Sequence, residues 1–237
     1  HLSETEEERQ NAIKEFGCSP VEYLAKLGCL NERTIAVHCV ALSDRDIELL
    51  AESGASVVHC PVSNMRLGCG ASPVVKLLKA GINVALGTDG AASACSLSMF
   101  EQMRTAGLIA KGFSQDPTEL TVNQIIRMAT INGANALKLH CDAGSLAVGK
   151  LADLAVIDMS QLVTMPVLDV LSNVIYAVEA QCVHQVWVSG SLVANIQQEK
   201  LLRPDRGKLL TKSNIMSWQN RAVSYTHLRA HETRGNL

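Results

Sequence analysis

The chain has 237 residues, of which 47% are hydrophobic and 19% are charged, and its net charge is −2. This length suffices for one large domain, or for one domain and part of another. The near-neutral balance, without a polybasic run, argues against a nucleic-acid or anionic-membrane partner. No apolar stretch reaches the roughly 20 residues that span a bilayer. The eight cysteines include no Cys-x-x-Cys pair, so we expect a reduced, cytoplasmic protein that uses Cys as a small hydrophobic residue.

The two ends of the sequence differ from the rest. His1 is followed almost at once by charged, helix-like sequence, without a Met, a signal peptide or a leading strand, and we expect a chain cut within a domain. Residues 201–223 are expected to form a helix or tail. Residues 224–237 resemble translated adapter sequence and are expected to be a non-native tail, so His227 and His231 are set aside as ligand candidates.

Apolar strand-like runs alternate with helical patterns in the first part of the chain. The predicted strands cover residues 33–40, 55–60 and 82–88, and the predicted helices cover residues 43–54, 72–81, 96–112 and 121–139. Ser43 and Asp46 form a capping box, and Gly54 ends that helix. A fourth strand is expected to end at the start of the chain. The alternation predicts a parallel sheet covered on its faces. None of the predicted strands is followed by a G-x-G-x-x-G loop, which argues against a nucleotide cofactor.

From Gly144 the pattern changes to short alternating strands, with a hairpin turn expected at Ser189 and Gly190. We therefore expect a small all-β segment after the α/β units. An eightfold βα barrel takes about 250 residues, so four units form either half of such a barrel or a complete small doubly wound sheet.

Polar side chains stand where the predicted strands end. They are His1, His38, His59 and Asp89. The carboxyl ends of parallel strands meet at one edge of a sheet, and imidazole and carboxylate groups are ordinary Zn²⁺ ligands. The sequence therefore predicts a metal site at this edge.

His59 also fits a second role, because a lone strand-end histidine is more often hydrogen-bonded to its neighbours than a ligand. Pro61, Ser63 and Asn64 follow it closely and form the loop that it would bind. Cys39 and Cys60 each directly follow a histidine. Neighbouring side chains of a strand point to opposite faces, which argues against a zinc site made of these His-Cys pairs.

Glu4 stands three residues after His1, ahead of the acidic turn formed by Glu6, Glu7 and Glu8. That turn is explained by the helix dipole, with Ser3 or Thr5 as the cap. A His-x-x-Glu at a strand end places an imidazole on a metal and a carboxylate beside it.

Five stretches of the sequence, taken in order, resemble the amidohydrolase superfamily, in its chlorohydrolase and aminohydrolase branch. They are "HLSET", "HC" after an apolar strand, "HCPVSNMRLGCG", "ALGTDGAAS" and "GSLAVGKLADLAVID". The resemblance implies the C-terminal half of a metal-dependent (β/α)8 TIM barrel over residues 1–143, with strands 5–8. It also implies part of a small β-sandwich over residues 144–200.

The resemblance further implies a role for each position. His1 matches a metal ligand, and Asp89 matches the ligand that also takes a proton from water. Glu4 matches the residue that moves protons to a substrate ring nitrogen. His38 matches the histidine that orients or polarises the substrate or the attacking water. Ser63 and Asn64 are expected to line the substrate pocket or to brace the loop.

The implied cofactor is one Zn²⁺ per subunit, with Fe²⁺ or another divalent metal as the alternative. The implied reaction is hydrolytic deamination of a purine nucleoside-like small molecule with release of ammonia, in a full-length protein that can be a homo-oligomer.

One departure from the family pattern is the missing His-x-His motif, and the first four barrel strands are missing with it. We therefore expect an N-terminally truncated chain that is inactive alone. The open alternatives are another amidohydrolase, such as a guanine or cytosine deaminase or a triazine chlorohydrolase, and a non-catalytic α/β fragment.

Overall fold

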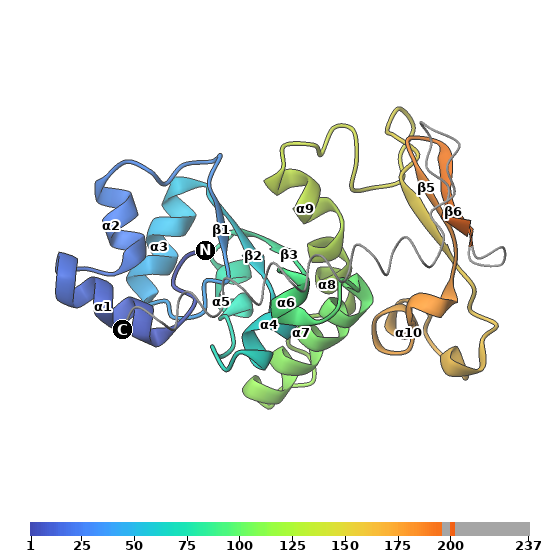
Figure 1. Cartoon of the computed structure of the whole chain (residues 1–237), viewed down its shortest axis with the longest axis horizontal. Helices are drawn as coiled ribbons and strands as arrows, with labels where there is room; N and C mark the ends of the chain where they lie inside the picture. The colour runs from blue at the N-terminus through green and yellow to red at the C-terminus, as the bar shows by residue number, and fades with distance from the viewer. Residues whose placement is uncertain (196–199, 202–237) are drawn as a thin grey trace. The chain divides into compact units, whose positions relative to one another are not determined.

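The computed structural model of the chain describes residues 1–195 and 200–201. It forms two compact units, whose elements are labelled in Figure 1. The first unit comprises His1–Lys150 and Leu162–Ala180, and the second comprises Leu151–Gln161 and the described residues from Gln181 onward. Apart from Leu201, the helix or tail predicted over residues 201–223 and the tail predicted over 224–237 lie outside the described residues. The domain limits expected from the sequence stay predictions.

The first unit contains a three-stranded parallel sheet in the order β1-β2-β3. Its strands are β1 (Ile35–Val37), β2 (Ser56–His59) and β3 (Asn83–Leu86). Val57 of the central strand stands opposite Ala36 and Val84, and all three side chains are buried. On the far side of β1, Leu2 makes an isolated parallel bridge with His38. The three predicted strands are confirmed, each shorter than predicted, and the expected fourth strand is represented by this single bridge.

The other regular elements of the first unit are helices (Figure 1). In chain order they are α1 (Glu6–Phe16), α2 (Pro20–Lys26), α3 (Asp44–Ser53), α4 (Pro61–Arg66), α5 (Val74–Lys79), α6 (Ala91–Ala94), α7 (Met99–Ser114), α8 (Val122–Ala129), α9 (Ile131–Ala136), η1 (Leu162–Thr164) and α10 (Val170–Tyr176). The predicted capping box of α3 is confirmed: Ser43 and Asp46 each bond the other's backbone N–H, and Gly54 ends the helix with φ of 69°. Its local spacing made this cap visible in the sequence.

The single helix predicted over residues 121–139 is wrong. The structure divides it into α8 and α9, which meet at Thr130, whose φ of −131° and ψ of −97° are not helical. The cause is tertiary, because Asn132 docks on the edge strand β3. Its Nδ2 donates to the carbonyl of Val84 at 2.8 Å, and its own carbonyl accepts from Asn83 at 3.0 Å. The break thus supplies hydrogen-bond partners to an edge strand.

The second unit contains an antiparallel sheet in the order β4-β5-β6-β7. Its elements are β4 (Leu154–Ile157), β5 (Val183–Val188), β6 (Ser191–Asn195) and β7 (Lys200–Leu201), with a 3₁₀ turn, η2 (Ala180–Cys182), before β5. The predicted hairpin is confirmed: Ser189 and Gly190 both have positive φ, 49° and 76°, as a type I′ turn requires.

The expectation of an all-β segment from Gly144 onward is wrong, because the chain returns to the first unit and forms α10. Asp169 caps this helix by accepting from the backbone N–H of Ser172 at 2.7 Å. Ile175, on the buried face of α10, is completely inaccessible, and the helix packs on α7 and α8. Burial against helices distant in sequence, rather than local alternation, decides this stretch.

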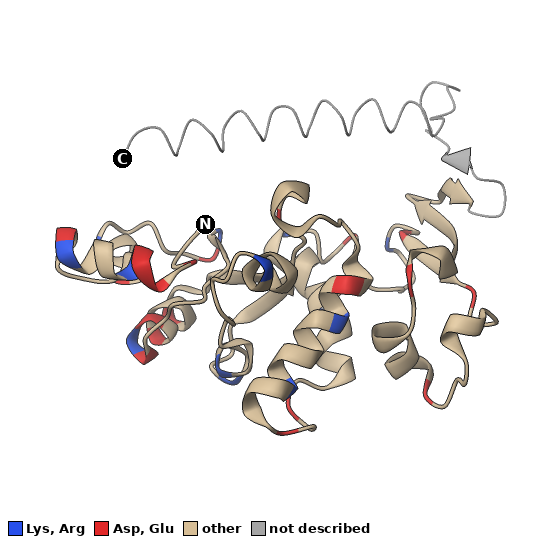
Figure 2. Ribbon diagram, turned by 60° about the horizontal axis from the view of Figure 1, so that its bottom comes forward, with Lys and Arg blue, Asp and Glu red and all other residues tan. Residues whose placement is uncertain are grey.

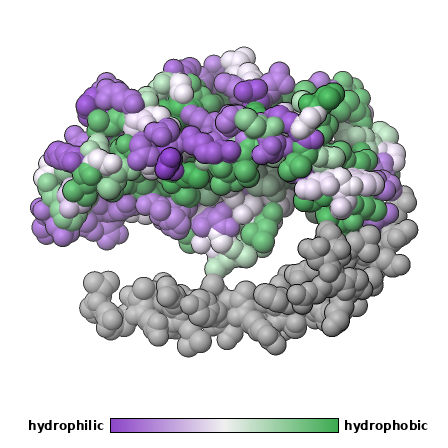
Figure 3. Space-filling model, turned by 90° about the horizontal axis from the view of Figure 1, so that it is seen from above, coloured by the Kyte–Doolittle hydropathy of each residue, from purple (hydrophilic) through white to green (hydrophobic). Residues whose placement is uncertain are grey.

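The surface shows no single dominant feature in the part of the chain that the structure describes. Lys and Arg are interspersed with Asp and Glu along the helices (Figure 2). Hydrophobic and hydrophilic residues are mixed over the face seen in Figure 3. None of the described helices combines the length and the hydropathy that crossing a membrane requires.

Candidate active site

Three of the four residues predicted at strand ends come together. His1, His38 and Asp89 each offer one ligand atom, and these atoms lie within 4.8 Å of one another. The His1 and His38 rings meet edge to face, with their centroids 4.6 Å apart. His38 is fully buried, Asp89 is half-buried and His1 is exposed. Parallel strands bring these groups together because their carboxyl ends share one edge of the sheet.

The donor set of this cluster fits a divalent cation. Two imidazoles and a carboxylate are ligands that Zn²⁺ and related ions bind. The Nε2 atom of His38 is buried and has no hydrogen-bond partner among the described residues. A buried polar atom without a partner is costly, and a bound cation would satisfy it.

Glu4 lies between the two histidines. Its Oε1 is 3.8 Å from Nε2 of His38, and its Oε2 is 3.9 Å from Nδ1 of His1. These distances exceed those of direct hydrogen bonds, so room remains between the carboxylate and the rings. The structure therefore gathers His1, Glu4, His38 and Asp89 in one place.

Glu8 holds the turn that carries His1 and Glu4. Its carboxylate accepts the backbone N–H of Ser3 at 2.9 Å and that of Glu4 at 2.7 Å. Thr5 caps α1 by accepting from the backbone N–H of Glu8 at 3.0 Å. The helix dipole alone does not explain the position of Glu8, because its carboxylate also accepts hydrogen bonds from two backbone N–H groups. The Thr-x-x-Glu spacing of a capping box was the signal for this role.

Ser63 and Asn64 are fully buried and lie in the first turn of α4. The Ser63 hydroxyl donates to Oδ2 of Asp89 at 2.6 Å. Asn64 Oδ1 is 2.8 Å from Nδ1 of His38. Burial raises the pKa of the Asp89 carboxyl, but hydrogen bonds from Ser63 and the Gly90 backbone outweigh it, and the net pKa lies below its ordinary value. Asp89 is therefore a carboxylate at neutral pH.

Left-handed backbone conformations are found at the strand ends of this site. Ser3, His38, Cys39 and Asp89 have φ of 49°, 74°, 50° and 57°. Such values cost non-glycine residues free energy, of order 1–3 kcal/mol each, and they cluster at functional sites. The four residues stand beside or within the candidate cluster, which supports a functional reason for the strain.

The ligand atoms of this cluster come from His1, His38 and Asp89 and from none of the described cysteines. Burial raises the pKa of Cys39 and of Cys60 to about 12. Cys69 was missed by the sequence reasoning: its Sγ lies 3.6 Å from Oε1 of Glu4 and donates to it. No local signal predicts this contact, which joins residues 65 positions apart.

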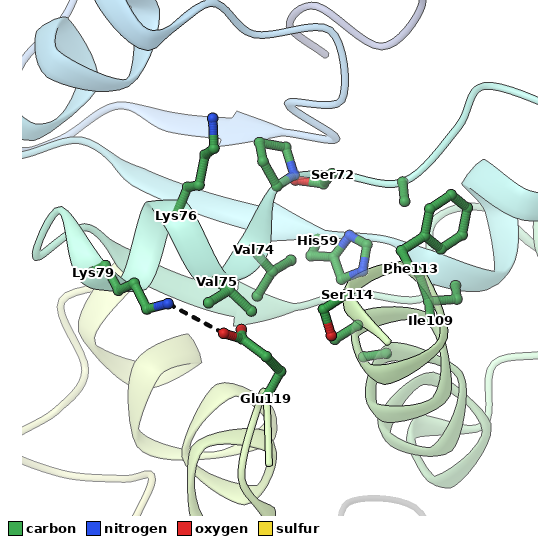
Figure 4. Close-up of a pocket in the computed structure, with 14 residues that line it drawn as sticks. His59, Ser72, Val74, Val75, Lys76, Lys79, Ile109, Phe113, Ser114 and Glu119 are labelled. Carbon is green, nitrogen blue, oxygen red and sulfur yellow. Dashed lines mark hydrogen bonds and ion pairs between the residues drawn. The ribbon is translucent and has the colours of Figure 1, made fainter. Parts of the chain in front are cut away.

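His59 is separate from the cluster. Its ring lines a cavity of about 400 Å³ between α5 and α7, among apolar side chains such as Val74 and Phe113 (Figure 4). Lys79 and Glu119 form an ion pair at 3.2 Å beside it. The Nδ1 atom of His59 has no hydrogen-bond partner among the described residues, so this atom does not make the hydrogen bond expected between His59 and the following loop. Burial, with the nearby His38 as a lesser cause, lowers the pKa of His59 to about 3.

Comparison with known proteins matches most of the chain to a single protein family. Residues 1–193 match the amidohydrolase family. The 5-methylthioadenosine/S-adenosylhomocysteine deaminase of Moorella thermoacetica is 45% identical over 193 residues, which are 81% of this chain and 45% of that protein. The 5'-deoxyadenosine deaminase of Methanothermobacter thermautotrophicus is 44% identical over 224 residues, 94% of this chain and 50% of that protein.

A solved structure gives the same picture. An adenosine deaminase from Xanthomonas campestris with bound zinc superposes with a TM-score of 0.85 at 40% identity, covering 94% of this chain and 50% of that one. The chain therefore spans about half the length of the relatives that it matches.

Proposed function

The chain belongs to the amidohydrolase family, and from this premise we propose that it is the C-terminal half of a metal-dependent hydrolytic deaminase. The substrate class we propose is a purine nucleoside such as 5-methylthioadenosine or S-adenosylhomocysteine. The juxtaposition of His1, His38 and Asp89 carries the proposal. The substrate class is supported by relatives that are named as adenosine-type deaminases.

The architecture we propose is strands 5–8 of a (β/α)8 barrel over residues 1–143. Part of a β-sandwich follows within residues 144–200, formed by the strands of the second unit and interrupted by α10, which belongs to the first unit. The barrel half is supported by the parallel neighbours Leu2, β1, β2 and β3, which follow one another in chain order. The sequence contains no His-x-His, so the remaining ligands would come from a partner half. We expect this chain alone to be inactive, and a homo-oligomer of the full-length protein stays a prediction.

His1 and Asp89 would hold the metal, with His38 within reach of it. Zn²⁺ is the first candidate and Fe²⁺ the alternative. When bound, such an ion lowers the pKa of water and makes a nucleophile available near neutral pH.

The chain's own residues would move the protons. Asp89 accepts a proton from the attacking water while the oxygen of that water bonds to the amine-bearing ring carbon. Protonated Glu4 gives its proton to the adjacent ring nitrogen. The proton on Asp89 then passes to the amine, the C–N bond breaks and ammonia leaves. Glu4 recovers a proton from the new hydroxyl as it becomes a carbonyl, which balances the reaction.

A chimaera tests the proposal directly. The N-terminal half of the Moorella relative, which is 45% identical over the matched region, is joined ahead of His1. Ammonia release is measured with 5-methylthioadenosine and S-adenosylhomocysteine. We expect turnover by the chimaera, and a loss of about 10²-fold or more for Asp89→Ala because a general base is removed. Asp116→Ala is the matched control, since its carboxylate only binds Thr118 locally.

The same chimaera separates the alternatives. Ammonia release from guanine or cytosine, or chloride release from a chlorinated triazine, with no turnover of the adenosine-type compounds, would replace the proposed substrate class. A folded chimaera that binds zinc but releases neither ammonia nor chloride from any of these compounds would favour a non-catalytic α/β module. Asp89→Ala with near-normal turnover would refute the assigned role of Asp89.

A further inference from the structure

Two consecutive residues of α4 hold two different members of the candidate site. The helix begins directly after β2, the central strand, with β1 on one side and β3 on the other. Successive helix positions differ by about 100° in direction. Ser63 thereby reaches Asp89 beyond the end of β3, and Asn64 reaches His38 beyond the end of β1. The single helical turn that follows the middle strand thus contacts residues at the ends of both neighbouring strands.

The contact between Asn64 and His38 sets the position of a proton. A side-chain amide oxygen only accepts hydrogen bonds, so with the Asn64 amide oriented as in this structure the Nδ1 atom of His38, 2.8 Å from Oδ1 of Asn64, carries the hydrogen. A neutral imidazole has a single N–H. The Nε2 atom of neutral His38 is therefore left with a lone pair.

That lone pair lies at the cluster. Nε2 is buried, lacks a partner in the described part of the chain, and stands 3.8 Å from the Glu4 carboxylate. Two acceptors that face each other are satisfied by a cation, a proton or a hydrogen-bond donor between them. The other tautomer would instead put an N–H toward Glu4 and leave two acceptors, Nδ1 and the amide oxygen, in contact.

We infer that Asn64 is a positioning residue that locks His38 in the Nδ1–H tautomer, so that His38 faces the site as an acceptor or metal ligand and not as a neutral hydrogen-bond donor. The meaning of this lock for catalysis rests on the proposed function. The lock itself is a property of the chain and is measured without substrate or metal. The amide oxygen of Asn64 is engaged with His38, whereas its buried Nδ2 has no hydrogen-bond partner among the described residues, so the expectation that Asn64 lines the substrate pocket or braces the loop stays a prediction.

The test uses the full 237-residue chain, labelled with ¹⁵N histidine and kept free of metal. Long-range ¹H–¹⁵N correlation spectra, recorded at mildly alkaline pH where ordinary imidazoles are neutral, show which ring nitrogen carries the proton. His38→Gln identifies the His38 signals by their loss. We expect the Nδ1–H pattern in the wild type and in Asn64→Asp, which keeps an acceptor oxygen, and a shift toward the Nε2–H form in Asn64→Ala.

Ser63→Ala is the matched control, because it alters the same helical turn without touching His38 and should leave the tautomer unchanged. An Nε2–H pattern in the wild type would overturn the inference, and so would a folded Asn64→Ala whose tautomer is unchanged. If Asn64→Ala does not fold, the wild type and Asn64→Asp still decide the outcome.

Cobalt(II) titration then connects the lock to the proposed metal site. Loss of a residue that orients a ligand typically weakens metal binding by about 10–100-fold, and we expect that loss for Asn64→Ala with recovery in Asn64→Asp. The titration is made on the chimaera described above, because the N-terminal half supplies the ligands that this chain lacks. A chimaera that shows the Nδ1–H tautomer at His38 but binds no cobalt would contradict the proposed metal site while leaving the lock intact.

Discussion

The parallel and antiparallel sheets of this chain differ in how deeply they are buried. Val57 of β2 and Val84 of β3 are fully inaccessible, whereas no residue of β4, β5 or β6 is buried. Helices cover a parallel sheet, so polar groups at its strand ends are withdrawn from water and need partners. The residues of β4, β5 and β6 are all exposed or half-buried instead. The difference explains why the candidate chemistry gathers in the first unit.

The largest effect we expect is on core packing. Leu77 lies on α5 and is 0% exposed, so Leu77→Ala should cost about 2–5 kcal/mol of unfolding free energy through the cavity that it leaves. Leu192→Ala in the half-buried strand β6 is the matched control and should cost less. Chemical denaturation followed by circular dichroism measures both. Equal losses would show that the two sheets contribute alike and would break the comparison.

Acid should destabilise the parallel unit through His59. Its pKa is lowered to about 3 in the folded chain, against about 6.5 when unfolded. The unfolded chain therefore binds the proton first as the pH falls, and stability should drop by about 2 kcal/mol between neutrality and about pH 5. The free energy of unfolding continues to fall with pH until the pH reaches the pKa of His59 in the folded chain.

His59→Gln should flatten this acid dependence, and His184→Gln, which removes an imidazole from β5, is the matched control. Urea denaturation at several pH values measures the slope. A steep slope that persists in His59→Gln would assign the acid sensitivity to other groups.

A smaller effect should follow from Glu8, which ties the first turn of the chain together. Glu8→Ala removes the acceptor of two backbone N–H groups and should cost about 0.5–2 kcal/mol, the range known for helix caps. Exposed Glu7, changed to Ala, is the control. Thermal unfolding compares the two variants, and equal melting temperatures would show that the Glu8 contacts contribute nothing.

The smallest effect is expected in the hairpin of the antiparallel sheet. Ser189 has φ of 49°, which asparagine tolerates better than serine, and Asn-Gly is the preferred type I′ pair. Ser189→Asn should raise stability by a few tenths of a kcal/mol, seen as a slightly higher denaturation midpoint. A lower midpoint would mean that the serine is needed for another reason.

Local spacing made some features predictable and left others out of reach. The capping box of α3 and the hairpin at Ser189 and Gly190 depend on residues within a few positions, and both are confirmed. The break at Thr130 and the presence of α10 depend on packing against β3 and α7, and both escaped prediction. Local helix propensity indicates that a segment is helical, whereas packing against distant elements decides where the helix ends.

The sequence by itself determined which groups end the parallel strands, namely His1, His38, His59 and Asp89, and the tertiary structure decided that three of them meet while His59 lies apart. Only the tertiary structure decided which side chain pairs with which. Asn64 meets His38 across 26 positions, and Cys69 meets Glu4 across 65. Periodicity fixes the face on which a residue stands, but the partner of a buried polar group depends on how distant segments pack around it.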